Sequence, residues 1–275
     1  MPQQAPPTME TRGLQVENLR AGYQKKIIID DISLSLPPGK MTILAGANGS
    51  GKSTLLNSIA RMITPHAGQV ILDGKAIHQQ PARQVARQLG ILPQTPLLPE
   101  GLTVAELISR GRFPWQGFLR QWSEADEQAV TEAMRLTGTE SLAHQQVENL
   151  SGGQRQRCWI AMTLAQQTPT ILLDEPTTFL DLRYQVDILE LLRDLTRYHN
   201  RTVIMVLHDL NFAVNYADTL VFLKQGKLCA VTDDPATCTP SLIQSVFDLD
   251  VQMSINPQTG KPFFMPFPAM KSSQE

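Results

Sequence analysis

The sequence predicts an α/β fold in which a helical segment interrupts a core of alternating strands and helices. Two aliphatic, β-branched runs, 170–173 and 202–206, suit strands of a sheet that is covered on both faces. A glycine-rich run, 46–54, stands between a short apolar strand, 41–45, and the start of a helix. From residue 103 to about 167 the apolar spacing is helical, so this part is expected to be an insert in the α/β core.

Shorter patterns complete the N-terminal part of the core. Residues 14–36 have a strand pattern with a turn near 22–26, and 69–72 and 89–92 are brief strand patterns. Residues 81–87 are expected to be helical.

Three residues of the helical segment suit helix N-termini. Thr103, with Glu106 three residues later, has the form of a capping box. Ser123 and Ser151 each stand before a further helical pattern, and serine is a favoured N-cap residue. The segment is therefore expected to hold three helices.

Towards the C-terminus, residues 184–198 carry apolar side chains at helical spacing. Residues 250–268 have the pattern of short strands and turns, which we expect to close the core. The two ends, 1–11 and 269–275, are expected to be a disordered and a frayed tail.

Composition excludes several classes of protein. The net charge of −2 lacks the basic excess of a nucleic-acid binder. No run of about 18 apolar residues is present, so no membrane-spanning helix is expected. The Pro- and Gln-rich N-terminus does not resemble a secretory signal. The odd number of cysteines, in no metal or redox spacing, indicates reduced thiols in a cytosolic protein: Cys158, Cys229 and Cys238.

The glycine-rich run fits the phosphate-binding pattern G-x-x-x-x-G-K-[ST]. Glycines let backbone N–H groups approach an anion, and a helix N-terminus adds partial positive charge. Lys52 would reach the β- and γ-phosphates and Ser53 would ligate Mg²⁺. A glycine-rich turn before a helix is the simpler alternative, but the flanking strand and helix favour a nucleotide site. The run consists of Gly46, Ala47, Asn48, Gly49, Ser50, Gly51, Lys52, Ser53 and Thr54.

Two carboxylates, Asp174 and Glu175, follow the aliphatic run 170–173. Ligands of α/β sheets bind at such strand ends. Asp174 would help to hold Mg²⁺, and Glu175 would polarise an attacking water. Two acids after an apolar run can also be surface turn residues; the phosphate loop favours the functional interpretation.

A second candidate anion site lies at residues 149–157. Ser151 would cap a helix whose first turn exposes glycine N–H groups. An ordinary capped helix with polar first-turn residues is the alternative.

These three motifs, in this order, resemble the ATP-binding subunit of ABC transporters. The pentapeptide Leu150-Ser151-Gly152-Gly153-Gln154 is the most specific of them. The resemblance implies a P-loop NTPase fold: a RecA-like core (12–94 and 168–268) with an antiparallel β-subdomain, and a helical insert specific to ABC proteins (about 95–167).

The resemblance also implies a head-to-tail homodimer that hydrolyses ATP with Mg²⁺. Each ATP would lie between the phosphate loop of one copy and Ser151, Gly152, Gly153 and Gln154 of the other. The Mg²⁺ site would be formed by Ser53, Gln94 and Asp174.

Four further positions match the family one at a time. Gln94 matches the glutamine that senses Mg²⁺ and water, and His208 matches the histidine that contacts the γ-phosphate. Asp181 matches the loop that crosses the dimer interface, and Tyr23 matches the aromatic that stacks on adenine. A lone His or Tyr is more often structural, but order and strand context favour these roles. The implied chemistry is in-line attack of water on the γ-phosphorus, with Lys52 and His208 stabilising charge.

Several stretches narrow the resemblance to the ATPases of bacterial iron–siderophore, ferric-citrate and haem importers: 109–115, 159–166, 174–185 and 207–211. Histidine is expected after Pro114, whereas this chain has Trp115, which is either a contact anchor or a packing residue. The resemblance implies a peripheral subunit on the cytoplasmic face of the inner membrane. Its partners would be integral membrane permease subunits and, indirectly, a periplasmic substrate-binding protein.

Other functions stay open at this point. The alternatives are the ATPase of a cobalamin importer, of another ABC transporter such as an exporter, a non-transport ABC ATPase, or a nucleotide-binding module without turnover. The chain lacks the long coiled coil of chromosome-associated relatives and carries one ATPase core.

Overall fold

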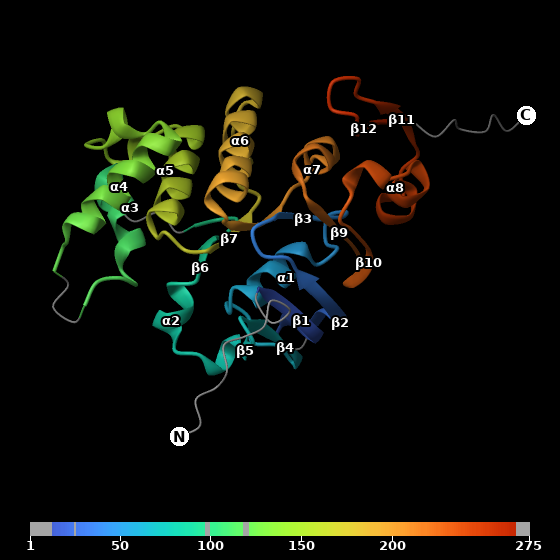
Figure 1. Cartoon of the computed structure of the whole chain (residues 1–275), viewed down its shortest axis with the longest axis horizontal. Helices are drawn as coiled ribbons and strands as arrows, with labels where there is room; N and C mark the ends of the chain where they lie inside the picture. The colour runs from blue at the N-terminus through green and yellow to red at the C-terminus, as the bar shows by residue number, and fades with distance from the viewer. Residues whose placement is uncertain (1–12, 25, 97–99, 118–120, 268–275) are drawn as a thin grey trace, which may run out of the picture.

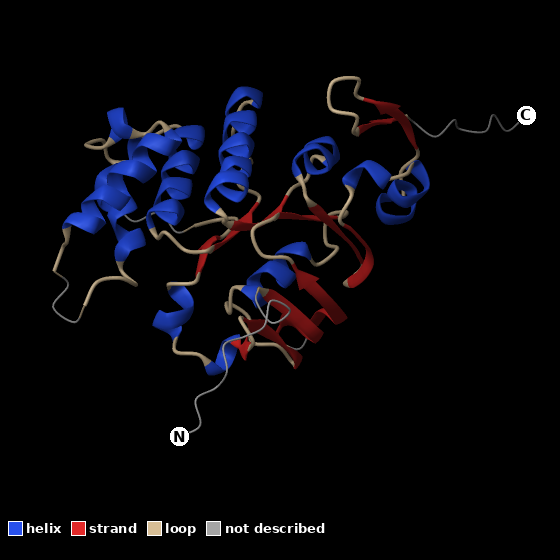
Figure 2. Ribbon diagram, in the orientation of Figure 1, coloured by secondary structure: helices blue, strands red, loops and turns tan. Residues whose placement is uncertain are grey.

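The computed structural model describes residues 13–24, 26–96, 100–117 and 121–267. Both predicted tails, 1–11 and 269–275, lie outside these residues. Within the described residues, six strands form the central sheet in the order β10-β9-β3-β8-β7-β6, and all neighbours are parallel except β10 and β9 (Figures 1 and 2). These strands are β3 (Met41–Ala45), β6 (Leu89–Leu92), β7 (Thr170–Asp174), β8 (Thr202–Val206), β9 (Thr219–Lys224) and β10 (Lys227–Thr232).

Both faces of this sheet are covered, as the aliphatic runs predicted. Every residue of β3, β7 and β8 is buried. Because side chains of a strand alternate between faces, Ile43 and Leu44 belong to two different hydrophobic cores. The core on the face of Ile43 includes residues of α5 (Gly152–Ala165), α6 (Leu182–His199), α7 (Leu210–Tyr216) and α8 (Pro240–Phe247).

A second, antiparallel sheet covers the opposite face through one helix. Its order is β2-β1-β4-β5, and α1 (Lys52–Ile59) lies between it and the central sheet, with Leu55, Leu56 and Ile59 fully buried (Figure 1). The turn predicted near residues 22–26 joins its first two strands. The strands are β1 (Leu14–Tyr23), β2 (Lys26–Leu36), β4 (Ala67–Leu72) and β5 (Lys75–Ala76), and the predicted helix at 81–87 is α2 (Ala82–Ala86).

The helical segment forms a group of three packed helices, α3 (Val104–Ser109), α4 (Glu124–Thr137) and α5. The three helix N-termini predicted from the sequence are confirmed. Thr103, Ser123 and Ser151 each cap a helix, and each is part of a full capping box.

A buried ion pair fixes one end of this group. The guanidinium of Arg112 contacts the carboxylate of Asp126 at 2.8 Å and also donates to the carbonyl of Ala165. Burial alone would raise the pKa of Asp126, but hydrogen bonds from Arg112 and Ser123 bring it below its ordinary value. The side chains of both ions are almost fully buried, so removing one would leave an uncompensated charge.

Short 3₁₀ turns link the longer elements, and α6 extends the helix predicted at 184–198 by a few residues. The turns are Ile77–Gln79, Arg110–Arg112, Glu140–Leu142, Val147–Asn149 and Pro235–Thr237. In the part of the chain that the structure describes, no helix is both long and apolar enough to cross a bilayer.

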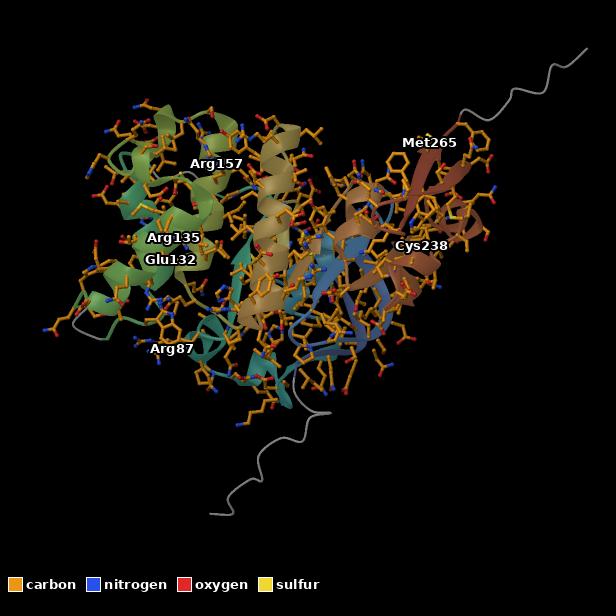
Figure 3. All side chains as sticks on the ribbon, turned by 45° about the horizontal axis from the view of Figure 1, so that its top comes forward. Arg87, Glu132, Arg135, Arg157, Cys238 and Met265 are labelled. Carbon is orange, nitrogen blue, oxygen red and sulfur yellow. The ribbon has the colours of Figure 1, made fainter. Side chains whose placement is uncertain are left out.

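The C-terminal strands do not extend the central sheet, but Val251 and Phe264 of these strands belong to the hydrophobic core, as the expectation that they close the core implies. Within the described residues, β11 (Val251–Ile255) and β12 (Pro262–Pro266) pair only with each other. The side-chain amide of Asn211 holds the hairpin through two hydrogen bonds with the backbone of Phe264. The ammonium of Lys261 donates to the carbonyls of Val214 and Asn215 at the end of α7. The hairpin is therefore fastened to a helix, and its other side carries exposed apolar groups such as Met265 (Figure 3).

One glycine joins three separate segments beneath the glycine-rich run. The N–H of Gly226 donates to the carbonyl of Ser50 at 3.0 Å, and its own carbonyl accepts from the N–H of Asp30 at 3.0 Å. Gly226 has φ of +77°, and a Cβ atom there would lie 2.0 Å from the carbonyl oxygen of Ile28. Only glycine fits this junction of β2, the β9–β10 turn and the glycine-rich run.

Gly226→Ala should lower the free energy of unfolding markedly, measured by urea or thermal unfolding. Gly260→Ala is the matched control, since Gly260 has φ of +68° but a Cβ atom there would meet no other atom within 4 Å. The control should lose about 1 kcal/mol from its left-handed backbone. Gly226→Ala should lose at least about 2 kcal/mol more, because the new methyl meets a fixed carbonyl. Equal losses would show that this junction is not tight.

Candidate functional site

A cleft of about 490 Å³ opens at the carboxyl ends of the parallel strands. It collects residues from four loops and from the antiparallel sheet. Its lining consists of Lys26, Ile28, Asn48, Gly49, Gly51, Lys52, Ser53, Thr54, Gln94, Glu175 and His208.

The glycine-rich run folds into a loop around the end of the Lys52 side chain. The ammonium donates to the carbonyls of Gly46 at 2.8 Å and Ala47 at 3.0 Å, and the N–H of Ser50 donates to Ala47 at 3.2 Å. Gly46 has φ of +148°, and a Cβ atom there would lie 2.2 Å from the carbonyl oxygen of Leu223. The loop therefore requires glycine at this position.

The ammonium of Lys52 is held in the loop and forms no direct ion pair with any residue that the structure describes. Burial lowers its pKa, and the nearby carboxylates of Glu175 and Asp174 partly oppose this shift. Its hydrogen bonds to two carbonyls leave a cation at the base of the cleft, where a phosphate group would be a stronger partner.

Asp174 lies beneath this cation at the end of β7. The hydroxyl of Ser53 donates to its carboxylate at 3.0 Å. Asp174 is only 2% exposed, and burial raises its pKa, assisted by the adjacent carboxylate of Glu175 and opposed by the hydrogen bond from Ser53. A hydroxyl and a carboxylate side by side are oxygen donors that suit Mg²⁺, which usually keeps waters and phosphate oxygens as its other ligands. No cluster of three or more His, Cys, Asp or Glu with metal-site geometry occurs in residues 13–24, 26–96, 100–117 and 121–267.

Glu175 and His208 face each other at the mouth of the cleft. The imidazole Nε2 of His208 lies 2.5 Å from a carboxylate oxygen of Glu175. The side chain of Glu175 is 10% exposed and that of His208 is 46% exposed, so the histidine forms the outer wall. Glu175 has φ of +55°, a conformation that is uncommon for residues other than glycine and that occurs often at functional sites. Gln94, just after β6, lines the same cleft.

The second candidate anion site lies on a different surface. None of Ser151, Gly152, Gly153 and Gln154 lines the cleft. The hydroxyl of Ser151 accepts from the N–H of Gln154, and the side chain of Gln154 accepts from the N–H of Ser151. Cβ atoms at the two glycines would lie 3.5–3.7 Å from Leu180 and Phe179, in the loop that leads to Asp181.

Asp181 and Tyr23 also lie outside the cleft lining. Asp181 caps α6, because its carboxylate accepts from the N–H of Tyr184 at 3.0 Å. Tyr23 is 51% exposed and pairs across the β1–β2 hairpin with Lys26, which does line the cleft. The structure thus gathers the phosphate loop, Gln94, Glu175 and His208, and leaves the Ser151 motif and Asp181 on another surface.

The sequence motifs did not indicate Lys26 and Ile28, which also line the cleft. They belong to the strand that pairs with the one carrying Tyr23, and only this hairpin pairing could have pointed to them.

Trp115 ties the helical group to the core. Its indole N–H donates to the carbonyl of Gln166 at 2.6 Å. The guanidiniums of Arg87, which is labelled in Figure 3, and of Arg112 lie 5.1 and 5.4 Å from the centre of its ring. Arg87 also donates to the carbonyl of Pro114 at 2.8 Å. Of the two interpretations of Trp115, the contacts favour packing.

The cysteines take no part in the cleft. All three are free thiols, and burial raises the pKa of Cys158 and of Cys238 to about 11. The raised pKa of these two thiols makes the reactive thiolate scarce at neutral pH.

Comparison with known proteins supplies the context for this cleft. A protein-family model described as "ABC transporter" matches residues 29–178. The chain is 48% identical over 258 residues to the "Probable siderophore transport system ATP-binding protein YusV" of Bacillus subtilis (strain 168), with 94% of each chain covered.

Two solved structures of known proteins have a fold similar to that of this chain. One is an inward-facing transporter assigned to the metal-chelate type of ABC transporter (TM-score 0.79, 28% identity, 94% of this chain and 98% of that chain covered). The other is a dimeric, post-hydrolysis state of an ATP-binding cassette bound to ADP and Pi (TM-score 0.72, 28% identity, 80% and 97% covered).

The raised pKa of Asp174 predicts that Asp174→Asn stabilises the nucleotide-free chain at neutral pH. An acid whose pKa is higher in the folded state than in the unfolded state destabilises the fold when it is ionised. The melting temperature should rise by about 2–4 °C at about pH 7.5, and the gain should shrink as the pH falls towards the ordinary range of aspartic acid. Asp187→Asn, at an exposed position on α6, should change little. A pH-independent loss in Asp174→Asn would contradict the pKa direction.

Proposed function

We propose that this chain energises uptake of an iron(III)–siderophore type metal chelate. The premise is that the chain belongs to the ABC transporter family and hydrolyses ATP, as members of this family do. The observation that carries the ATPase role is the gathering of Lys52, Glu175 and His208 around one cleft. The cargo rests on the 48% identity to a protein named for siderophore transport and on the likeness to a transporter of metal-chelate type.

The cleft residues have roles that follow from their chemistry. The phosphate loop would surround the phosphates of ATP with N–H groups, and Lys52 would exchange its two carbonyl partners for phosphate oxygens. Ser53 and Asp174 would hold Mg²⁺, with Gln94 nearby. Bound Mg²⁺ would neutralise charge on the phosphate oxygens.

Glu175 is the candidate that orients the attacking water. Its carboxylate is largely buried at the cleft mouth and is held at 2.5 Å by His208. In the reaction His208 would turn its imidazole towards the γ-phosphate, which frees a carboxylate oxygen for water. Water would then attack the γ-phosphorus in line with the leaving oxygen and pass a proton to Glu175, as the bond between the γ-phosphorus and the β–γ bridging oxygen breaks to give ADP and phosphate. Catalysis is mostly positioning and charge stabilisation.

The position of the Ser151 motif supports action as a head-to-tail homodimer. Because residues 151–154 do not line the cleft of their own chain, a second copy would supply them to the exposed side of the phosphates. Asp181, at the start of α6 beside Phe179, would cross the same interface. The dimeric form of a structural relative supports this arrangement. Tyr23, exposed beside Lys26, would stack on the adenine.

The remaining assignments extend this proposal to the whole transporter. One nucleotide-binding domain would span residues 12–268, with a core at 12–94 and 168–268 and a helical insert at about 95–167. Integral membrane permease subunits would hold the dimer on the cytoplasmic face of the inner membrane, and a periplasmic binding protein would deliver the chelate.

Glu175→Gln should keep ATP affinity near that of the wild type and lower steady-state ATP hydrolysis by at least about 100-fold, because the amide cannot accept a proton. ATP should then hold the variant as a dimer, measured by size-exclusion chromatography with light scattering. Lys52→Ala should instead lose ATP affinity, and Glu140→Gln, at an exposed position, should behave as the wild type. Rapid hydrolysis by Glu175→Gln would overturn its assignment.

Uptake of radiolabelled iron tests the cargo. Cells that lack the chain would be complemented with the wild type or with Glu175→Gln and supplied with a panel of siderophores, ferric citrate and haem. We expect one chelate to be taken up only with the wild type. If every iron chelate entered independently of the chain while labelled cobalamin required it, the iron assignment would fall and the ATPase role would remain.

A further inference from the structure

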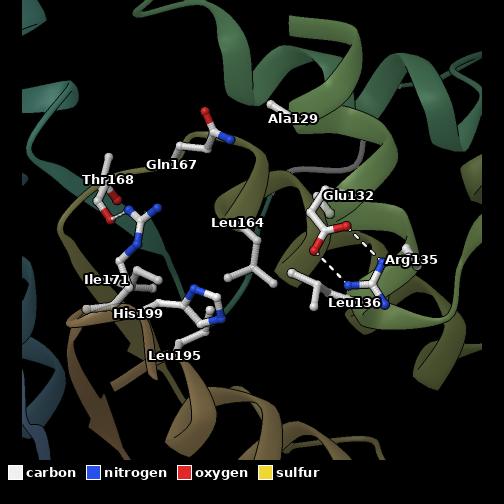
Figure 4. Close-up of a pocket in the computed structure, with 12 residues that line it drawn as sticks. Ala129, Glu132, Arg135, Leu136, Leu164, Gln167, Thr168, Ile171, Leu195 and His199 are labelled. Carbon is white, nitrogen blue, oxygen red and sulfur yellow. Dashed lines mark hydrogen bonds and ion pairs between the residues drawn. The ribbon is translucent and has the colours of Figure 1, made fainter. Parts of the chain in front are cut away.

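A second cavity, of about 290 Å³, lies between the helical group and the core (Figure 4), and it shares no lining residue with the phosphate cleft. Side chains of α4 and α5 line one side, and β7, α6 and the residues just before β7 and β8 line the other. The lining consists of Ala129, Glu132, Ala133, Arg135, Leu136, Leu164, Gln167, Thr168, Ile171, Leu195, His199 and Arg201.

The cavity has an apolar floor and a polar rim. Leu164, Ile171 and Leu195 are buried at the floor. Glu132, Arg135 and His199 are exposed at the rim. Small-molecule sites commonly have this division, in which apolar surface supplies affinity and a few polar groups fix orientation.

Glu132 is already neutralised by a cation. Its carboxylate receives two hydrogen bonds from Arg135, at 2.7 and 2.8 Å, as the dashed lines in Figure 4 show. These hydrogen bonds lower the pKa of Glu132, so it stays ionised and paired. The carboxylate of Glu132 is therefore engaged by Arg135, with a smaller electrostatic contribution from His199.

Arg201 has no such carboxylate partner in the part of the chain that the structure describes. It follows Asn200, which ends α6 in a left-handed conformation, and its half-buried guanidinium donates to the carbonyl of Thr168. Among the described residues no carboxylate forms an ion pair with it, and burial, unopposed by any carboxylate, lowers its pKa. Burying a cation without a counter-charge costs free energy, and a charge-assisted hydrogen bond from an anion would offset that cost.

We infer that this cavity binds a small organic carboxylate, whose acidic end pairs with Arg201 and whose apolar body lies on Leu164, Ile171 and Leu195. The floor selects an organic anion over inorganic phosphate, because a fully polar ion would leave these three side chains uncovered. The ligand would touch the helical group and the core at once, so its occupancy would report on, and restrain, the angle between them.

4-Fluorobenzoate is a suitable probe, followed by ¹⁹F NMR on the full chain with saturating ADP and Mg²⁺. The nucleotide occupies the phosphate loop, so that any remaining binding is elsewhere. For so small a ligand we expect saturable binding with a dissociation constant of about 1 mM. Neutral 4-fluorobenzamide should bind at least about tenfold more weakly, because it lacks the charge that Arg201 recognises.

Arg201→Gln should weaken binding of 4-fluorobenzoate at least about tenfold. Arg183→Gln is the control, since the side chain of Arg183 is 87% exposed on α6, outside the cavity. The comparison of acid with amide uses the wild type alone and holds even if Arg201→Gln fails to fold. The inference is overturned if saturable binding is absent up to about 10 mM, if the amide binds as well as the acid, or if folded Arg201→Gln binds like the wild type.

Discussion

The alignment of three parallel strands determines most of the phosphate cleft. Val206 of β8 pairs with Leu44 of β3 on one side and with Asp174 of β7 on the other. These residues form one row across the sheet, so the segments that follow them leave the sheet at the same edge. The glycine-rich run begins two residues after Leu44, and His208 stands two residues after Val206. A slip of this register would separate the cation of Lys52 from the carboxylates that face it.

Polar contacts at Arg112 and Trp115 add to the hydrophobic core that the helical group and the α/β core share. Arg112 reaches Asp126 within the helical group and the carbonyl of Ala165 at the end of α5, and it also borders Trp115. Trp115 in turn meets Arg87 of the core. Hydrogen bonds and ion pairs are directional and weaken when their geometry changes. They therefore restrict the orientation of the helical group relative to the core more than apolar contacts do. The cavity beside Arg201 lies on the same boundary, where packing is less complete.

Local signals in the sequence predicted the parts of the fold that depend on local physics. The buried strands, the three capped helices and the glycine-rich run follow from residues close together in the chain, and all were expected. Features that depend on residues far apart were not. Lys26 enters the cleft only through hairpin pairing, and Asn211 captures the C-terminal strand through hydrogen bonds across 53 residues. Among the site residues, the spacing of glycines and Lys52 in the sequence indicated the phosphate loop. The 2.5 Å contact between Glu175 and His208 joins residues far apart in the sequence, so only the structure shows it.

The attachment of the C-terminal hairpin to α7 has a mechanical consequence. Asn211 and Lys261 fasten the hairpin to both ends of this short helix, and the helix starts directly after His208 and its neighbour Asp209. A movement of the hairpin would therefore act on the helix that directly follows the segment carrying His208. The exposed apolar residues of the hairpin are thus linked, through α7, to the wall of the phosphate cleft.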